Sequence, residues 1–299
     1  VDAVFTTRTR AWRKRPLSAS TRAEIGILKT RLQELQPELT IDAQGLLKSA
    51  TITRWTGAPR RTGLARPWRR ERLAGFAYTD VVRGAPPGSH VASTNLELVR
   101  ATGAEPPPLT PPDGRWLLTG DRRQTTKNHA VILPGAGGAH KVIAESTLAA
   151  VAHDLARSGL EVVVAWGPGE KERAQSVADR GGEGVRPAPP TNLLELASLM
   201  GSAAVVIGGD TGPVHLAASL GVPTLAVFLA SDWRRNGPLG PRTEVVTGAR
   251  QLGDSPSATA KTGLDHEVGP DEIMAAARRL LESSPFVPPG FKAGAVERK

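Results

Sequence analysis

The fold class of this chain is decided by the stretch Gly208-Gly209-Asp210-Thr211-Gly212-Pro213-Val214-His215-Leu216-Ala217-Ala218. The apolar run before it, 203–207, predicts a buried strand, and 214–220 has the pattern of a short helix. Pro213 suits the first helical position, because its missing N–H would have no partner there. Glycines before it let a ligand approach the backbone. The stretch predicts a strand, a turn and a helix start whose free amides suit a phosphate, with the His215 imidazole in reach. Alone, it also fits the βα turn of any α/β domain.

The chain around this stretch alternates between strand and helix patterns. Strands are expected at 130–133, 161–166, 205–208 and 224–228, and helices at 145–157, 170–178 and 271–282. Another helix is expected to begin at Asn192, with Glu195 completing a capping box. This alternation predicts a parallel sheet that binds ligands at the carboxyl ends of its strands. The loops that leave those ends begin at Pro134, Gly167, Gly208 and Leu229.

The first third of the chain is less regular. We expect a helix at 21–36, a strand at 39–42, a helix opening within 44–50, and an irregular arginine-rich segment at 54–72. The proline-rich segment 105–113 reads as a linker between domains. The expected organisation is an N-terminal domain at 1–112, a nucleotide-sugar-binding domain at 113–282 and a loose tail at 283–299.

Composition narrows the function classes. The 299 residues include no cysteine, which excludes disulfides and thiolate metal sites, and the six histidines show no metal-binding spacing. The net charge of +9 favours anionic partners, although arginines on solvated faces would give the same charge. Aromatic residues make up only 4%, too few to form the series of stacking platforms of an RNA-binding surface, so no nucleic-acid partner is expected. No apolar run approaches the ~20 residues of a membrane span.

Two further loops have residues suited to a nucleotide. Gly135 and Gly137 can present backbone N–H groups to a phosphate, and Lys141 adds a mobile positive charge, although a plain surface loop has the same composition. The Walker A spacing is absent. After the next strand, the carboxylate of Glu170 can accept both hydroxyls of a ribose, or it can stabilise the start of the following helix.

Several motifs together resemble one family. Four segments are similar to segments of the ADP-heptose:lipopolysaccharide heptosyltransferases, glycosyltransferase family 9. They are Asp-Thr-Gly-Pro-x-His-x-Ala-Ala at 210–218, Gly-Val-Pro-Thr at 221–224, Asn-Gly-Pro-Leu-Gly at 236–240 and Ile-Asp-Ala-Gln-Gly-Leu-Leu-Lys-Ser-Ala at 41–50. Weaker matches occur at 70–78 and 90–103. The resemblance covers roughly Val1 to Leu281.

This resemblance implies a GT-B fold with two Rossmann-like domains facing a cleft. It implies inverting, metal-independent transfer of heptose from ADP-heptose to the Kdo sugar of a lipid A precursor, without a cofactor. Lys141 would be the catalytic residue that neutralises the leaving diphosphate. The other implied donor-binding residues are Gly135, Gly137, Glu170 (with Glu172 as the alternative), Thr191 beside Asn192, Asp210, Thr211, Gly212 and His215.

Two departures from the family pattern matter. Val142-Ile143-Ala144 stands where the family commonly has Trp-Pro. The family's catalytic aspartate lies in a loop that would precede Val1, so the catalytic base in this chain is unknown. The N-terminal domain is therefore expected to be truncated, and the chain is expected to bind the donor but to transfer little heptose. The arginine-rich segment 60–72 would face the anionic acceptor and membrane, which places the protein in the cytoplasm, peripheral at the inner face of the inner membrane. The alternatives are a GT-B enzyme that uses another nucleotide sugar, or an inactive nucleotide-binding fragment.

Overall fold

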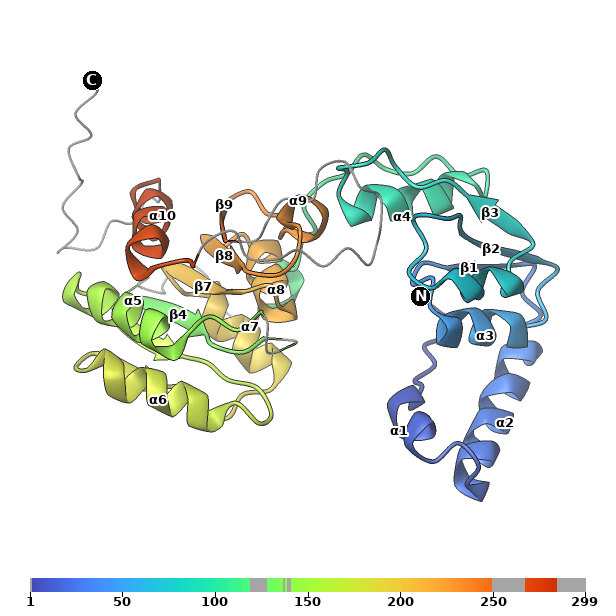
Figure 1. Cartoon of the computed structure of the whole chain (residues 1–299), viewed down its shortest axis with the longest axis horizontal. Helices are drawn as coiled ribbons and strands as arrows, with labels where there is room; N and C mark the ends of the chain where they lie inside the picture. The colour runs from blue at the N-terminus through green and yellow to red at the C-terminus, as the bar shows by residue number, and fades with distance from the viewer. Residues whose placement is uncertain (1, 119–127, 137, 139–140, 249–266, 284–299) are drawn as a thin grey trace. The chain divides into compact units, whose positions relative to one another are not determined.

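The computed structural model describes residues 2–118, 128–136, 138, 141–248 and 267–283 (Figure 1). They divide into two compact units, with the chain passing from the first to the second between Leu109 and Thr110. This point lies inside the proline-rich segment. Gly137 and nearly all of the expected tail lie outside the described residues. The finer domain boundaries and the roles expected for each domain stay predictions.

The first unit contains a small parallel sheet in the order β1-β2-β3. Its elements are α1 (Thr9–Lys14), α2 (Ala19–Glu34), β1 (Leu39–Asp42), α3 (Leu47–Trp55), β2 (Arg60–Leu64), the 3-10 helix η1 (Arg72–Ala77), β3 (Asp80–Val82) and α4 (Val91–Arg100). The strand β2 lies inside the segment that we expected to be irregular. Its strand pattern is weakened by charged Arg60 and Arg61 and by Gly63. A Cβ atom on Gly63 would lie 2.3 Å from the ring of Tyr78, so the strand needs glycine there to admit the ring.

Asp42 organises the first unit. Its side chain is buried, and its two oxygens accept hydrogen bonds from the amides of Gln44 (2.9 Å) and Gly45 (3.1 Å), from Ser49 Oγ (2.9 Å) and from Tyr78 Oη (2.7 Å). Burial, and then the hydrogen bond to Asp42, raise the pKa of Tyr78 well above its ordinary value. With four donors around it, Asp42 fixes the turn between β1 and α3, which is a structural role.

The second unit is built around a six-stranded parallel sheet in the order β6-β5-β4-β7-β8-β9. Its elements are the 3-10 helix η2 (Arg115–Leu117), β4 (His129–Leu133), α5 (Glu145–Arg157), β5 (Glu161–Val164), α6 (Lys171–Gly181), β6 (Val185–Pro187), α7 (Leu193–Gly201), β7 (Val205–Gly209), α8 (Gly212–Ser219), β8 (Thr224–Phe228), α9 (Trp233–Asn236), β9 (Thr243–Thr247) and α10 (Pro270–Glu282). This strand order is that of a doubly wound nucleotide-binding fold. The expected α/β class with parallel sheets is confirmed.

Helices cover both faces of this sheet. Buried side chains of α5, α6 and α10 form one core with the sheet, and those of α7 and α8 form the other. Figure 1 shows α5 and α6 running side by side. Strand order reverses between β4 and β7, because the chain winds outward in opposite directions from these two strands. In folds of this kind, ligands bind at the carboxyl edge of the sheet where the strand order reverses.

The predicted helices and strands of the second unit are largely confirmed, with small shifts. The helix predicted at 214–220 begins earlier, at Gly212, so Pro213 is its second residue. The strand predicted at 161–166 ends at Val164. The sequence analysis missed β6, α9 and β9, which are short and contain charged or proline residues that interrupt a periodic pattern.

Candidate nucleotide-sugar site

A cluster of charged side chains lies where the strand order reverses. Lys141, in the loop after β4, donates a hydrogen bond from Nζ to Oδ2 of Asp210, the residue that follows β7. Ser231 Oγ, beyond β8, donates to the same oxygen at 2.6 Å. His215 Nε2, on α8, lies 3.9 Å from Asp210 Oδ1, an ion-pair distance rather than a hydrogen bond. The fold thus brings together three residues predicted for the site and adds Ser231, which sequence reasoning did not single out.

The charge state of Asp210 follows from these neighbours. Burial of the carboxyl group by itself would raise its pKa, but the interactions with His215, Lys141 and Ser231 outweigh burial and hold the pKa well below the ordinary value. Only 13% of the Asp210 side chain is exposed, against 26% for Lys141 and 42% for His215. Asp210 is therefore a fixed negative charge that orients a more accessible ammonium group.

The start of α8 borders this cluster. Thr211 is the N-cap and Gly212 is the first helical residue, so the amides of these two residues have no acceptor within the helix. Pro213 has no N–H, and the amides of Val214 and His215 donate to the carbonyl oxygen of Thr211. A Cβ atom on Gly212 would have no protein atom within 4 Å, so the space in front of the helix is open. A Cβ on Gly209 would lie 3.4 Å from the carbonyl oxygen of Lys141, which places β7 directly beside the lysine backbone. Free amides, the helix dipole and a nearby ammonium group are the features with which helix N-termini bind anions, so this end of α8 is the candidate site for a phosphate.

Glu170 and Gly135 meet between the loops after β4 and β5. Glu170 Oε2 accepts a hydrogen bond from the Gly167 amide at 2.9 Å. A Cβ atom on Gly135 would lie 2.1 Å from Glu170 Oε1, so this position of the carboxylate requires glycine at 135. Glu170 is the N-cap residue of α6 and its side chain makes no cap hydrogen bond. Its carboxylate still lies at the positive end of the α6 dipole, so the alternative that it stabilises the helix start through its charge stays open beside ribose binding. Glu172 is exposed on the first turn of α6.

The residues expected near the adenine lie before α7. Asn192 Oδ1 accepts hydrogen bonds from the amides of Leu194 (2.9 Å) and Glu195 (3.0 Å), and Glu195 Oε2 accepts one from the Asn192 amide at 2.7 Å. The predicted capping box is confirmed, and it commits the Asn192 side chain to the helix. Thr191, directly before the cap, is partly exposed.

The first unit has a separate basic hollow that sequence reasoning missed. A cavity of about 690 Å³ between α1 and α3 is lined by residues that include Arg10, Arg13, Lys48, Trp12 and Trp55. The signal in the sequence is the run of basic residues on both sides of Trp12. One carboxylate, that of Glu71, also lines it, so the cations exceed the anions by two. This excess of positive charge beside two indole rings suits an anionic group attached to an apolar one.

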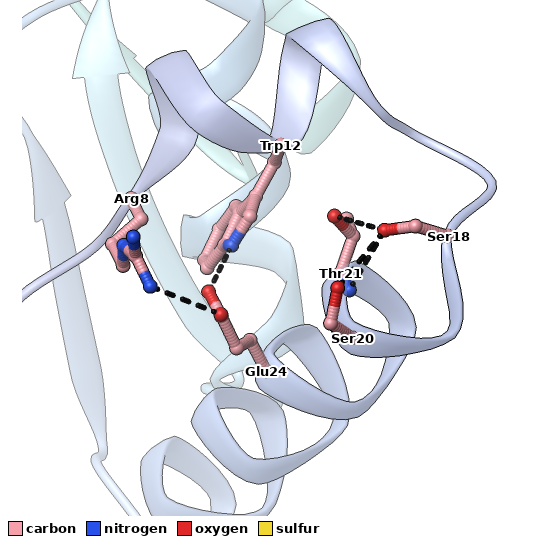
Figure 2. A network of polar contacts seen from close by, with 6 residues as sticks. All are labelled: Arg8, Trp12, Ser18, Ser20, Thr21 and Glu24. Carbon is pink, nitrogen blue, oxygen red and sulfur yellow. Dashed lines mark hydrogen bonds and ion pairs between the residues drawn. The ribbon is translucent and has the colours of Figure 1, made fainter.

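Glu24 holds the basic helix α1 against α2, as Figure 2 shows. Its Oε2 accepts a hydrogen bond from Trp12 Nε1 at 2.7 Å, and its Oε1 lies 3.3 Å from Arg8 Nη1. Two arginines of the predicted acceptor-facing segment serve the fold instead. Arg61 donates to the carbonyls of Ala77 (2.7 Å) and Ala58 (2.6 Å), and Arg69 donates to three backbone carbonyls.

A doubly wound parallel sheet with charged side chains and a helix start at its switch point is the arrangement typical of nucleotide-binding domains. The chain belongs to glycosyltransferase family 9, the heptosyltransferase family, whose model matches residues 25–265. It is 33% identical to lipopolysaccharide heptosyltransferase 1 of Pseudomonas aeruginosa PAO1 over 258 residues, which cover 83% of this chain and 70% of that protein. It is 28% identical to the Escherichia coli K12 protein of the same name over 244 residues, covering 78% and 73% of the two chains.

Solved structures give the same picture. The structure of the E. coli heptosyltransferase WaaC with ADP has a TM-score of 0.74 at 26% identity, covering 93% of this chain and 84% of that one. The WaaC structure with ADP-2-deoxy-2-fluoro heptose has a TM-score of 0.70 at 28% identity, covering 92% and 82%. The family resemblance and the glycosyltransferase class predicted from the sequence are confirmed. In the described part of the chain, no helix is long and apolar enough to cross a membrane.

Proposed function

We propose that this protein transfers heptose from ADP-heptose to the Kdo sugar of a lipid A precursor, in the synthesis of the lipopolysaccharide inner core. The observation that carries the proposal is the Lys141–Asp210–His215 cluster beside the open amides of α8. Family membership, and relatives that are heptosyltransferases, support the choice of heptose as the sugar.

The donor diphosphate would bind against the start of α8. Lys141 would then exchange part of its contact with Asp210 for the phosphate oxygens, and the amides of Thr211 and Gly212 would donate to the same group. As the acceptor hydroxyl oxygen bonds to the anomeric carbon, the bond between that carbon and the phosphate oxygen breaks and ADP leaves. Lys141 and His215 would stabilise the negative charge that develops on the leaving diphosphate. The acceptor proton passes to a general base.

The nucleoside would extend toward the loops after β5 and β6. Glu170 is held at one oxygen by the Gly167 amide and can accept ribose hydroxyls at the other. Gly135 permits this because it leaves space for the carboxylate. Thr191 would contact the adenine. Donor specificity would thus rest on groups from neighbouring loops of one rigid sheet.

The acceptor would bind to the first unit. The hollow between α1 and α3 offers Arg10, Arg13 and Lys48 to the negative charges of Kdo and lipid A phosphates. Arginines of 60–72 that are not used by the fold would add to this attraction. The same basic surface would hold the protein at the inner face of the inner membrane, from the cytoplasmic side.

Competition for the donor site tests the proposal. A fluorescent ADP analogue bound to the protein should be displaced by ADP and ADP-heptose at similar concentrations, and by UDP-sugars only at much higher ones. Displacement by a UDP-sugar at lower concentration than ADP-heptose would favour the alternative, a GT-B enzyme with another nucleotide-sugar donor.

A further inference from the structure

Arg173, on α6, bridges the two ends of the loop that carries Lys141. Its Nε donates to the carbonyl oxygen of Pro134 at 2.9 Å, directly after β4, and its Nη2 donates to the carbonyl oxygen of Ile143, two residues beyond Lys141. Its Nη1 donates to Glu145 Oε1 at 3.1 Å, at the start of α5. One planar guanidinium therefore joins the strand end, the loop end and the next helix.

The anchors of this bridge are firm. The Arg173 side chain is only 22% exposed, and Ile143 is buried in the core that α5 and α6 share. The second oxygen of Glu145 accepts a hydrogen bond from Ser176 Oγ at 2.6 Å, one turn further along α6. The arginine therefore cannot shift without breaking contacts on several sides.

We propose that Arg173 is a positioning residue for the donor phosphates: by tying Pro134 to Ile143, it fixes the backbone two residues beyond Lys141, whose ammonium group contacts Asp210 just before α8. This inference rests on the proposed function of Lys141. Lysine cannot replace arginine fully here, because its ammonium group is a point charge, whereas the guanidinium presents donors in a fixed fork. When the backbone on either side of a charged residue is held in this way, that residue loses less entropy on binding an anion.

The alternative is that Arg173 only stabilises the second unit. The two roles differ in their coupling to Lys141. A positioning role requires that loss of Arg173 weakens ADP binding only while Lys141 is present, whereas a structural role weakens binding regardless of residue 141.

A double-mutant cycle separates these roles. ADP affinity is measured by calorimetry for the wild-type protein, Arg173→Ala and Arg173→Lys, each with Lys141 and with Lys141→Ala. Arg180→Ala, an exposed arginine on the same helix, is the control, and thermal unfolding of each variant reports the fold. We expect Arg173→Ala to weaken ADP binding about tenfold with Lys141 and less than twofold without it. Arg173→Lys keeps a positive charge beside Glu145 and should show the same dependence on Lys141 with a smaller loss of ADP affinity. It provides the test if Arg173→Ala does not fold.

Equal losses in both backgrounds, or no loss with Lys141 present, would overturn the inference. Failure of the wild-type protein to bind ADP would instead overturn the proposed function. In that case amide hydrogen exchange at 142–144 still tests the bridge: Arg173→Ala should speed exchange there, with the strands β4 and β7 unchanged, and unchanged exchange at 142–144 would refute it.

Discussion

Replacing Lys141 by alanine should weaken ADP binding by roughly ten- to a hundred-fold. The lost interaction is a charge-assisted hydrogen bond, which contributes about 1.5–3 kcal/mol. Two features of the structure change the loss of ADP affinity expected within this range. Lys141 must give up part of its contact with Asp210 to reach a phosphate, which lowers its net contribution. Once the lysine is gone, however, the Asp210 carboxylate remains close to the site without that cation and repels the ligand, which moves the effect toward the upper end.

Isothermal titration calorimetry of ADP into the wild-type protein and Lys141→Ala measures this effect. Lys171→Ala, which removes an exposed lysine at the start of α6, is the matched control and should bind ADP like the wild type. The double variant Lys141→Ala/Asp210→Asn should recover part of the lost affinity, because it also removes the repelling charge. Unchanged affinity in Lys141→Ala would exclude Lys141 from the site and refute this reasoning.

Three other outcomes follow from the site. Gly135→Ala should displace the Glu170 carboxylate and weaken ADP binding as much as Glu170→Ala does, with little further loss in the double variant; additive losses in calorimetry would contradict their contact. Because the fold lowers the pKa of Asp210, the ionised carboxylate stabilises the folded state at pH values above its ordinary pKa of 3.8, and this stabilisation is lost as the pH falls further. The loss of stability with acid, followed by circular dichroism, should therefore be less steep in Asp210→Asn. ADP-heptose binding should survive EDTA, since cationic side chains and amides hold the phosphates; its loss on chelation would show that a metal is needed.

Local signals made much of the second unit predictable. The helix at 145–157 and the strand at 224–228 appear with the predicted bounds, and the Asn192 capping box forms as its sequence pattern indicates. These features depend on residues a few positions apart, so a single sequence contains their full signal.

What depends on distant contacts was harder to predict. Lys141 and Asp210 are 69 positions apart, and their pairing depends on the strand order, which local patterns do not encode. The strand β2 was missed because Gly63, which has a low strand propensity, is needed there to leave space for the ring of Tyr78. Arg173 left no signal, since two of its partners are backbone carbonyls, which any residue provides.

The central claim is tested most directly by following the sugar itself. The full-length protein is incubated with ADP-heptose and a Kdo-lipid A acceptor, and the lipid is analysed by mass spectrometry. We predict one added heptose on the Kdo sugar, release of ADP, and strong loss of product in Lys141→Ala. An acceptor left unmodified by ADP-heptose but glycosylated from another nucleotide sugar would contradict the account.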